Sequence, residues 1–292
     1  MATMETITER DTIKTITTHH IDGEFVESHG REVMNIIQPT NGKVIARVTL
    51  GDEEDTRRAI AKHAFASFGR TTKEERSRYL RPGGPSGSHF SLYEQCQACA
   101  AGTRLLVPKS RLDEVKRAIR DEMRAFTVGD PADPNVAVGP MVSQKQYERV
   151  ESYIRKGIEE GAEVLVGGEG HPKGLEAGYF VKPTVFVNVK NDMTIAQEEI
   201  FGPVLCVITY DSEDEAIRIA NDSKYGLHSS VLGTDLQRAR RVASQIRAGR
   251  VVINGMTDDP QAPWGGFKYS GIGREYGRYG IEAFLEPRAI LE

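Results

Sequence analysis

The sequence has few cysteines and no long apolar run. Its 3 cysteines in 292 residues cannot form a disulfide framework, and such a low, odd count suits a reducing compartment. No apolar run approaches the roughly 20 residues that span a bilayer, and residues 1–22 lack the apolar core of a secretory signal. We therefore expect a soluble, cytoplasmic protein that does not bind a membrane.

An excess of charge of one sign is also absent. Lys and Arg number 38 against 42 Asp and Glu, a formal net charge of −4. A nucleic-acid-binding surface needs a clustered basic face, so we expect no nucleic acid partner. The 29 glycines and 13 prolines are too few for a collagenous or low-complexity chain. The length corresponds to about two globular domains.

The N-terminal part contains strand and helix patterns. Residues 21–26 and 33–37 alternate between apolar and polar, which predicts two short strands joined by a turn at residues 28–30. Residues 52–68 have acidic side chains in their first turn and apolar side chains at helical spacing, which predicts a helix. A second helix is expected over residues 72–80.

Residues 82–87 then place two prolines and three glycines in six positions, which ends any helix. Beyond this interruption, predicted strands and helices alternate. The predicted helices are residues 110–126, 143–160, 212–221 and 235–247, and the predicted strands are residues 162–166, 179–187, 204–210, 229–232 and 251–254. The order predicts an α/β domain with a mostly parallel sheet, and the continuous apolar character of residues 204–210 predicts a strand that is buried on both faces.

Two glycine-rich segments do not have the pattern of a phosphate-binding loop. The segment from Gly271 to Gly277 is spaced one residue too long for a dinucleotide fingerprint, and no buried strand runs directly into it. Gly168-Glu-Gly170 follows a predicted strand, but Pro172 prevents the immediate helix that would hold a pyrophosphate. We expect this second segment to be a hairpin loop.

The cysteine spacing leaves several interpretations open. Cys96-Gln-Ala-Cys99 has the spacing of a thiol redox pair or of half a metal site. A zinc site needs about four ligands, and no second pair of ligands stands at a suitable spacing, so we expect no metal. Cys206 lies in an apolar predicted strand and is expected to be an inert core residue.

Three ordered motifs carry a family resemblance. Gln97-Ala-Cys-Ala-Ala-Gly-Thr-Arg104 resembles the catalytic-cysteine signature of the aldehyde dehydrogenase superfamily. Gln197-Glu-Glu-Ile-Phe-Gly-Pro-Val204 is similar to its Glu-x-Phe-Gly-Pro motif, and Pro263-Trp-Gly-Gly-Phe-Lys-Tyr-Ser-Gly271 to its C-terminal Gly-Gly-x-Lys-x-Ser-Gly stretch. The resemblance covers residues 97–292, and residues 21–80 also resemble the N-terminal segment of the family. It implies the α/β aldehyde dehydrogenase-like catalytic domain.

The resemblance also implies a reaction. Cys99 would attack an aldehyde carbonyl to give a thiohemiacetal, with its own backbone N–H as one oxyanion donor, and hydride would pass to NAD or NADP. Water would then hydrolyse the thioester to a carboxylic acid. Glu199 matches the glutamate that binds the nicotinamide ribose, and Phe201 would pack beside the nicotinamide. If the resemblance is set aside, Glu198 and Glu199 could be solvated charges before a buried strand, and Phe201 could be a core residue.

Parts of the family pattern are missing. Members are usually longer by roughly 190 residues, which is more than an average domain. The gap falls between Leu80 and Cys96 and implies a truncated member that lacks most of the cofactor-binding domain. The Asn of the oxyanion hole and the general-base Glu of a Glu-Leu-Gly-Gly motif are also absent. The implied organisation is a remnant of the nucleotide-binding domain (1–80), an atypical junction (81–95), a catalytic domain (96–250) and a C-terminal segment with an oligomerisation strand (251–292).

Three functional hypotheses follow. The first is an NAD(P)-dependent aldehyde dehydrogenase acting on a small aldehyde, impaired by these losses. The second is a non-catalytic fragment that associates as a homo-oligomer through residues 283–291. The third is a cofactor-independent thiol esterase at Cys99, or a redox pair of Cys99 with Cys96. The sequence predicts neither the aldehyde nor the choice between NAD and NADP.

Overall fold

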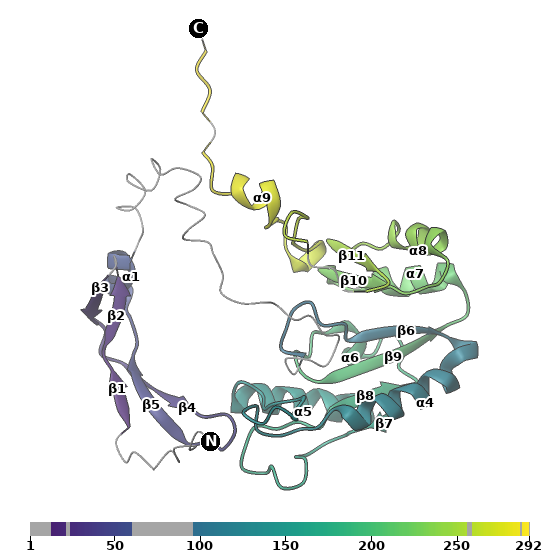
Figure 1. Cartoon of the computed structure of the whole chain (residues 1–292), viewed down its shortest axis with the longest axis horizontal. Helices are drawn as coiled ribbons and strands as arrows, with labels where there is room; N and C mark the ends of the chain where they lie inside the picture. The colour runs from purple at the N-terminus through teal and green to yellow at the C-terminus, as the bar shows by residue number, and fades with distance from the viewer. Residues whose placement is uncertain (1–12, 22–23, 60–95, 256–258, 287, 292) are drawn as a thin grey trace, which may run out of the picture. The chain divides into compact units, whose positions relative to one another are not determined.

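The computed structural model describes residues 13–21, 24–59, 96–255, 259–286 and 288–291 (Figure 1). The chain divides into two compact units, Met1–Gly87 and Ser88–Glu292, which we describe separately. The division falls inside the predicted junction at residues 81–95. That junction, the predicted helix over residues 72–80 and the second half of the predicted helix over residues 52–68 lie outside the described residues.

The first unit contains two small sheets. Its elements are β1 (Lys14–Ile16), β2 (Thr18–Ile21), β3 (Glu24–Glu27), β4 (Val33–Ile37), β5 (Val44–Thr49) and α1 (Glu53–Ala59). Strand β5 lies between β1, to which it is parallel, and β4, to which it is antiparallel. Strands β2 and β3 form a separate antiparallel hairpin. The predicted pairing of residues 21–26 with residues 33–37 is therefore wrong, because β3 pairs with the strand before it, β2, and β4 pairs with the strand after it, β5.

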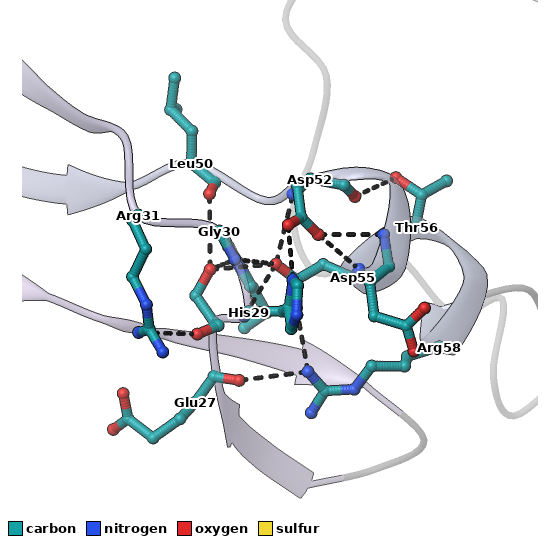
Figure 2. Close-up of polar contacts among 12 residues, drawn as sticks. Glu27, His29, Gly30, Arg31, Leu50, Asp52, Asp55, Thr56 and Arg58 are labelled. Carbon is teal, nitrogen blue, oxygen red and sulfur yellow. Dashed lines mark hydrogen bonds and ion pairs between the residues drawn. The ribbon is translucent and has the colours of Figure 1, made fainter.

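Residues 28–30, predicted as the turn of that hairpin, instead surround the carboxylate of Asp55 (Figure 2). The backbone N–H groups of His29 and Gly30 donate to Asp55 at 2.9 and 3.0 Å, and the Ser28 hydroxyl donates at 3.0 Å. The amide of Gly30, followed by that of His29, holds the pKa of Asp55 well below its usual range. These bonds attach the first turn of α1 to the segment that precedes β4.

The second unit is built on a four-stranded sheet in the order β6-β9-β8-β7. Its strands are β6 (Arg104–Pro108), β9 (Val204–Tyr210), β8 (Thr184–Val187) and β7 (Glu163–Val166). Strands β6, β9 and β8 are parallel, and β7 is an antiparallel edge strand. This sheet confirms the predicted α/β class with mostly parallel strands. Residues 179–183, predicted as part of a strand, precede β8 without strand pairing.

Helices cover both faces of this sheet (Figure 1). One face is covered by α4 (Leu112–Glu122), which the short 3₁₀ turn η2 (Lys109–Arg111) precedes and η3 (Met123–Ala125) follows. The other face is covered by α5 (Gln144–Glu159) and the short α6 (Thr194–Gln197). Because side chains alternate along a strand, Phe186 packs in the cluster with α5 and α6, whereas Val185 and Val187 pack with α4. The predicted burial of β9 on both faces is confirmed by Cys206 and Val207, which lie in these two separate clusters.

Two further strands, β10 (His228–Val231) and β11 (Arg250–Ile253), form a parallel pair, accompanied by α7 (Glu213–Asn221) and α8 (Leu236–Ala243). Helices α5, α7 and α8 begin where the sequence predicts because a polar side chain caps each start. Ser143, Ser212 and Asp235 accept hydrogen bonds from backbone N–H groups of the first turns.

The C-terminal part contains η4 (Lys268–Ser270) and α9 (Gly277–Glu282). The described residues from 283 to 291 have no strand partner in a single chain, and their apolar side chains are exposed, Phe284 to 87% and Leu291 to 92%. The oligomerisation strand therefore stays a prediction. Among the helices of the described ranges, none has the length and apolar character to cross a membrane.

Candidate active site

Cys99 lies in a tight turn that leads into β6. The N–H of Ala101 donates to the carbonyl of Ala98 at 3.0 Å, and this turn leaves Cys99 exposed. Cys96 and Cys206 are 2% and 1% exposed, and burial raises the pKa of each thiol to about 12. Both buried thiols are therefore protonated at neutral pH. Only the thiolate form of a cysteine is a good nucleophile, so Cys99 is the accessible candidate and Cys96 is poorly suited to a redox pair.

The second candidate segment joins α6 to β9 and contains Glu199 and Phe201. Phe201 has a φ of 63°, in the left-handed region that a bulky side chain rarely adopts. The Gln146 side-chain amide holds this conformation, because its Nε2 donates to the carbonyls of Ile200 at 3.2 Å and Phe201 at 2.7 Å. Helix α5 thus fixes the backbone on which Glu199 and Phe201 stand.

Two more side chains of α5 contact the same segment. The Arg149 guanidinium donates to the carbonyl of Glu199 at 2.7 Å, and the Tyr153 hydroxyl donates to a carboxylate oxygen of Glu198 at 2.6 Å. Burial, followed by this bond to Glu198, raises the pKa of Tyr153. Gln146, Arg149 and Tyr153 stand at positions i, i+3 and i+7, so they share one helix face. We call these three residues the α5 clamp.

The two neighbouring glutamates are therefore not equivalent. Glu198 is held by Tyr153, whereas the exposed carboxylate of Glu199 has no hydrogen-bond partner among the described residues. A carboxylate that is exposed, unpaired and attached to a fixed backbone can accept hydrogen bonds from two hydroxyl groups of a ligand. The sequence favoured Glu199 over Glu198 only through the motif, and the contacts now give a physical distinction between them.

The Cys99 turn and the Glu199 segment lie at the same edge of the sheet. Strands β6 and β9 are parallel, with Arg104 opposite Cys206, so the segments that precede them enter the sheet together. Helix α5 also connects to both segments. The Gln97 side-chain oxygen accepts a hydrogen bond of 2.9 Å from the N–H of Val142, two residues before α5 begins, while the α5 clamp holds the Glu199 segment.

A glycine in the second motif allows α5 to pack this closely. A Cβ atom at Gly202 would collide with Cγ2 of Val150 and lie 2.9 Å from its Cγ1. The glycine of the Phe-Gly-Pro sequence is therefore required by the packing of α5 on this segment. Sequence reasoning missed Gln146 and Arg149, although a repeat of polar residues beside the apolar stripe of the predicted helix was a usable signal.

The third motif has a structural role in the described part of the chain. The Lys268 ammonium donates to the carbonyls of Asn221 at 2.7 Å and Ser223 at 2.9 Å, at the end of α7. Such carbonyls lack partners inside the helix, and a cation stabilises them. Burial lowers the pKa of Lys268. Within the described ranges, no group of three or more His, Cys, Asp or Glu side chains could hold a metal ion.

Comparison with known proteins decides the family. The sequence model of the aldehyde dehydrogenase family matches residues 87–290. This chain belongs to the aldehyde dehydrogenase family. A Staphylococcus haemolyticus protein named as an aldehyde dehydrogenase is 56% identical over 194 residues, which are 66% of this chain and 41% of that protein. The chain thus spans about two fifths of the length of this aldehyde dehydrogenase relative.

Solved aldehyde dehydrogenase structures agree with the fold. Aldehyde dehydrogenase C of Pseudomonas syringae, solved with NAD+ and octanal, is 25% identical and has a TM-score of 0.85 over 93% of this chain and 95% of that chain. A Mycobacterium tuberculosis aldehyde dehydrogenase, solved with NAD+, is 41% identical with a TM-score of 0.66 over 82% of this chain and 56% of that chain.

Proposed function

We propose that the chain carries the thiol half of an aldehyde-oxidising active site, with Cys99 as nucleophile, Glu199 as the residue that binds the nicotinamide ribose and Phe201 as the residue that packs beside the nicotinamide. The observation that carries this proposal is the exposed Cys99 turn at the same sheet edge as the clamped Glu199 segment. The substrate is a small aldehyde and the acceptor is NAD or NADP. We place this reaction in the cytoplasm and expect a homo-oligomer joined through residues 283–291.

The chemistry assigned to Cys99 is nucleophilic catalysis. Its thiolate sulfur attacks the carbonyl carbon, a C–S bond forms, and the carbonyl electrons move to oxygen to give a thiohemiacetal anion. The backbone N–H of Cys99 donates to this oxyanion. Departure of hydride leaves an acyl thioester on Cys99. Water then cleaves the C–S bond and releases a carboxylic acid and the thiol.

The residues fit the nicotinamide half of the cofactor. Glu199 is exposed and its carboxylate makes no hydrogen bond within the described ranges, so both ribose hydroxyls can donate to it. Gln146 and Arg149 hold the backbone around it. When bound, NAD(P)+ supplies the hydride acceptor. The proposed contacts cover the ribose and nicotinamide, and the family segment that holds the adenosine half falls in the gap between Leu80 and Cys96.

We further propose that turnover by this chain alone is impaired. Loss of one oxyanion donor lowers the rate by about 10²–10³, and the Trp-Asn sequence that supplies this donor in the family is absent. The Glu-Leu-Gly-Gly sequence of the general base is also absent. Without that base an acyl thioester on Cys99 hydrolyses slowly, so acylation is expected to outpace deacylation.

The exposure of Cys99 favours one second candidate, a cofactor-independent thiol esterase. An activated ester acylates a thiolate without hydride transfer, so this activity needs neither Glu199 nor NAD(P)+. The two candidates differ in deacylation. An esterase releases product over many turnovers, whereas an impaired dehydrogenase stops after about one acylation per chain.

The test measures NAD(P)H formation at saturating cofactor over a panel of aldehydes, with Cys99→Ala as control and circular dichroism to establish folding. The proposal predicts no sustained NAD(P)H formation by the folded chain, and acylation of Cys99 by p-nitrophenyl acetate. Sustained NAD(P)H formation that requires Cys99 would contradict the proposed impairment. Ester turnover that survives in Cys99→Ala would contradict the assignment of the nucleophile.

A further inference from the structure

A hollow of about 470 Å³ lies along α5, on a different helix face from the α5 clamp. Its lining consists of Tyr147, Glu148, Glu151, Ser152 and Arg155 from the helix, and Glu169 and Gly170 from the loop after β7. The positions of the helical residues place the hollow about opposite Gln146 and Arg149. It is therefore separate from the proposed active site, and no residue assigned to that site lines it.

Glu151 is the unusual member of this lining. The residue is only 7% exposed, and one carboxylate oxygen, Oε2, accepts a hydrogen bond of 2.8 Å from the N–H of Gly170. The other oxygen, Oε1, is buried and has no hydrogen-bond partner among the described residues. A buried carboxylate oxygen without a partner is costly, by about 1–3 kcal/mol or more for a charged group. Such an oxygen calls for a hydrogen-bond donor that the described residues do not supply.

The surroundings of Glu151 add aromatic surface. The ring of His171 stacks on that of Tyr147, with centroids 4.6 Å apart and planes inclined by 14°. His171 Nδ1 is also buried without a hydrogen-bond partner in the described part of the chain. Burial, followed by the charge of Glu151, raises the pKa of Tyr147. The hollow thus combines a carboxylate that has one unpaired oxygen with the ring of Tyr147, on which His171 stacks.

Of the three carboxylates that line the hollow, only that of Glu169 forms an ion pair with a described residue. Arg155 pairs with Glu169 at 3.1 Å, and Lys182 donates to the backbone carbonyl of Glu169. Glu148 accepts a hydrogen bond of 2.8 Å from the Gln144 amide. Neither Glu148 nor Glu151 has an ion-pair partner among the described residues. An anionic ligand is therefore disfavoured, and a cationic one is favoured.

We propose that this hollow binds the ammonium group of a small organic amine. A primary ammonium group donates up to three hydrogen bonds, so it can bind Glu148 in the hollow and also Oε1 of Glu151 once a rotation of the Glu151 carboxyl group exposes that buried oxygen. The ring of Tyr147 adds a favourable surface for a cation. A calcium ion needs six to eight oxygen ligands, more than these two carboxylates offer. This proposal is independent of the reaction assigned to Cys99.

The Gly170 amide provides a direct probe, because its N–H donates to Glu151. In a sample labelled with ¹⁵N at glycine, titration with n-butylammonium chloride is expected to shift the Gly170 resonance along a saturable curve. Tetramethylammonium at equal ionic strength has the charge but no N–H donor, and butan-1-ol has the alkyl chain but no charge. Neither is expected to produce a saturable shift at Gly170.

Variants assign the effect to the carboxylates. Glu151→Gln is expected to weaken butylammonium binding by about tenfold or more, the value of a lost charge-assisted hydrogen bond. Glu148→Gln, at an exposed position, is expected to weaken it as well. Glu159→Gln, on the same helix but outside the hollow, should bind as the unmodified chain does.

Two results would overturn the proposal. The absence of a saturable shift with butylammonium would mean that a single bound water satisfies Oε1. Equal binding by Glu148→Gln, Glu151→Gln and the unmodified chain would place the amine elsewhere. Both results are measured by binding alone, so the presence or absence of enzymatic activity at Cys99 does not affect how they are interpreted.

Discussion

Replacement of Gly202 by alanine tests the contact between α5 and the Glu199 segment. The structure places no unusual φ at Gly202, so its backbone suits alanine, and the packing of the new methyl group decides the outcome. That methyl group would collide with Cγ2 of Val150, which is fully buried. Relief requires the segment to move away from α5. Such movement would stretch the hydrogen bonds from Gln146 to the carbonyls of Ile200 and Phe201.

The magnitude follows from this overlap. Overpacking of a dense core costs about 1–3 kcal/mol, offset by about 0.4–1 kcal/mol because alanine restricts the unfolded chain. Gly202→Ala is therefore expected to lower the free energy of unfolding by about 1–2 kcal/mol. In a domain of about 200 residues, a loss of this size lowers Tm by roughly 2–8 °C. Gly233→Ala is the matched control, because no atom lies within 4 Å of its added Cβ and its φ is ordinary.

A double-mutant cycle identifies the cause. Val150→Ala removes both methyl groups that Gly202→Ala would meet, at a cost of about 2 kcal/mol for the lost core packing. In the double variant the collision disappears, so the measured coupling is expected to be about 1–2 kcal/mol in the favourable direction. Urea denaturation of the four proteins gives these values. Additive effects of the two substitutions would refute the packing argument.

Three further predictions concern other contacts. Gln146→Ala is expected to weaken any NAD(P)+ binding, measured by calorimetry, because the backbone of Phe201 loses its hydrogen bonds, whereas Cys99 acylation should not change. The pKa of Asp55 is lower in the folded state than its unfolded value near 4, so in this pH range the unfolded state binds more protons. The free energy of unfolding, measured by urea denaturation, should therefore fall as the pH drops below about 4. Asp55→Asn should reduce this pH dependence. Phe284→Lys with Leu291→Lys is expected to shift any oligomer to monomer in sedimentation, and an unchanged oligomer would contradict association through residues 283–291.

The sequence predicted the second unit well because its signals are local. Ser143 and Ser212 cap helices that start at the expected positions, and β9 has the predicted bounds. A capping side chain and an apolar run depend on a few adjacent residues, and little in the tertiary structure competes with them. The same holds for the burial of Cys206.

Pairing and side-chain partners were harder to predict. Alternation at residues 33–37 indicates a strand but does not specify whether its neighbour is β3 or β5. The role of Glu198 depends on Tyr153, which is 45 residues away in the sequence, and that of residues 28–30 depends on Asp55. The unsatisfied oxygen of Glu151 likewise had no sequence signal, because it arises only when α5 packs beside the loop at Gly170.

The most direct measurement for the central claim is peptide mapping by mass spectrometry after brief treatment with p-nitrophenyl acetate at neutral pH. Cys99 is exposed, whereas the buried thiols of Cys96 and Cys206 have pKa values of about 12 and serve as internal controls. The account predicts one acetyl group per chain, located on Cys99 and retained because deacylation is slow. Equal acetylation of all three cysteines, or none at Cys99 in a folded chain, would contradict the assignment of Cys99 as the nucleophile.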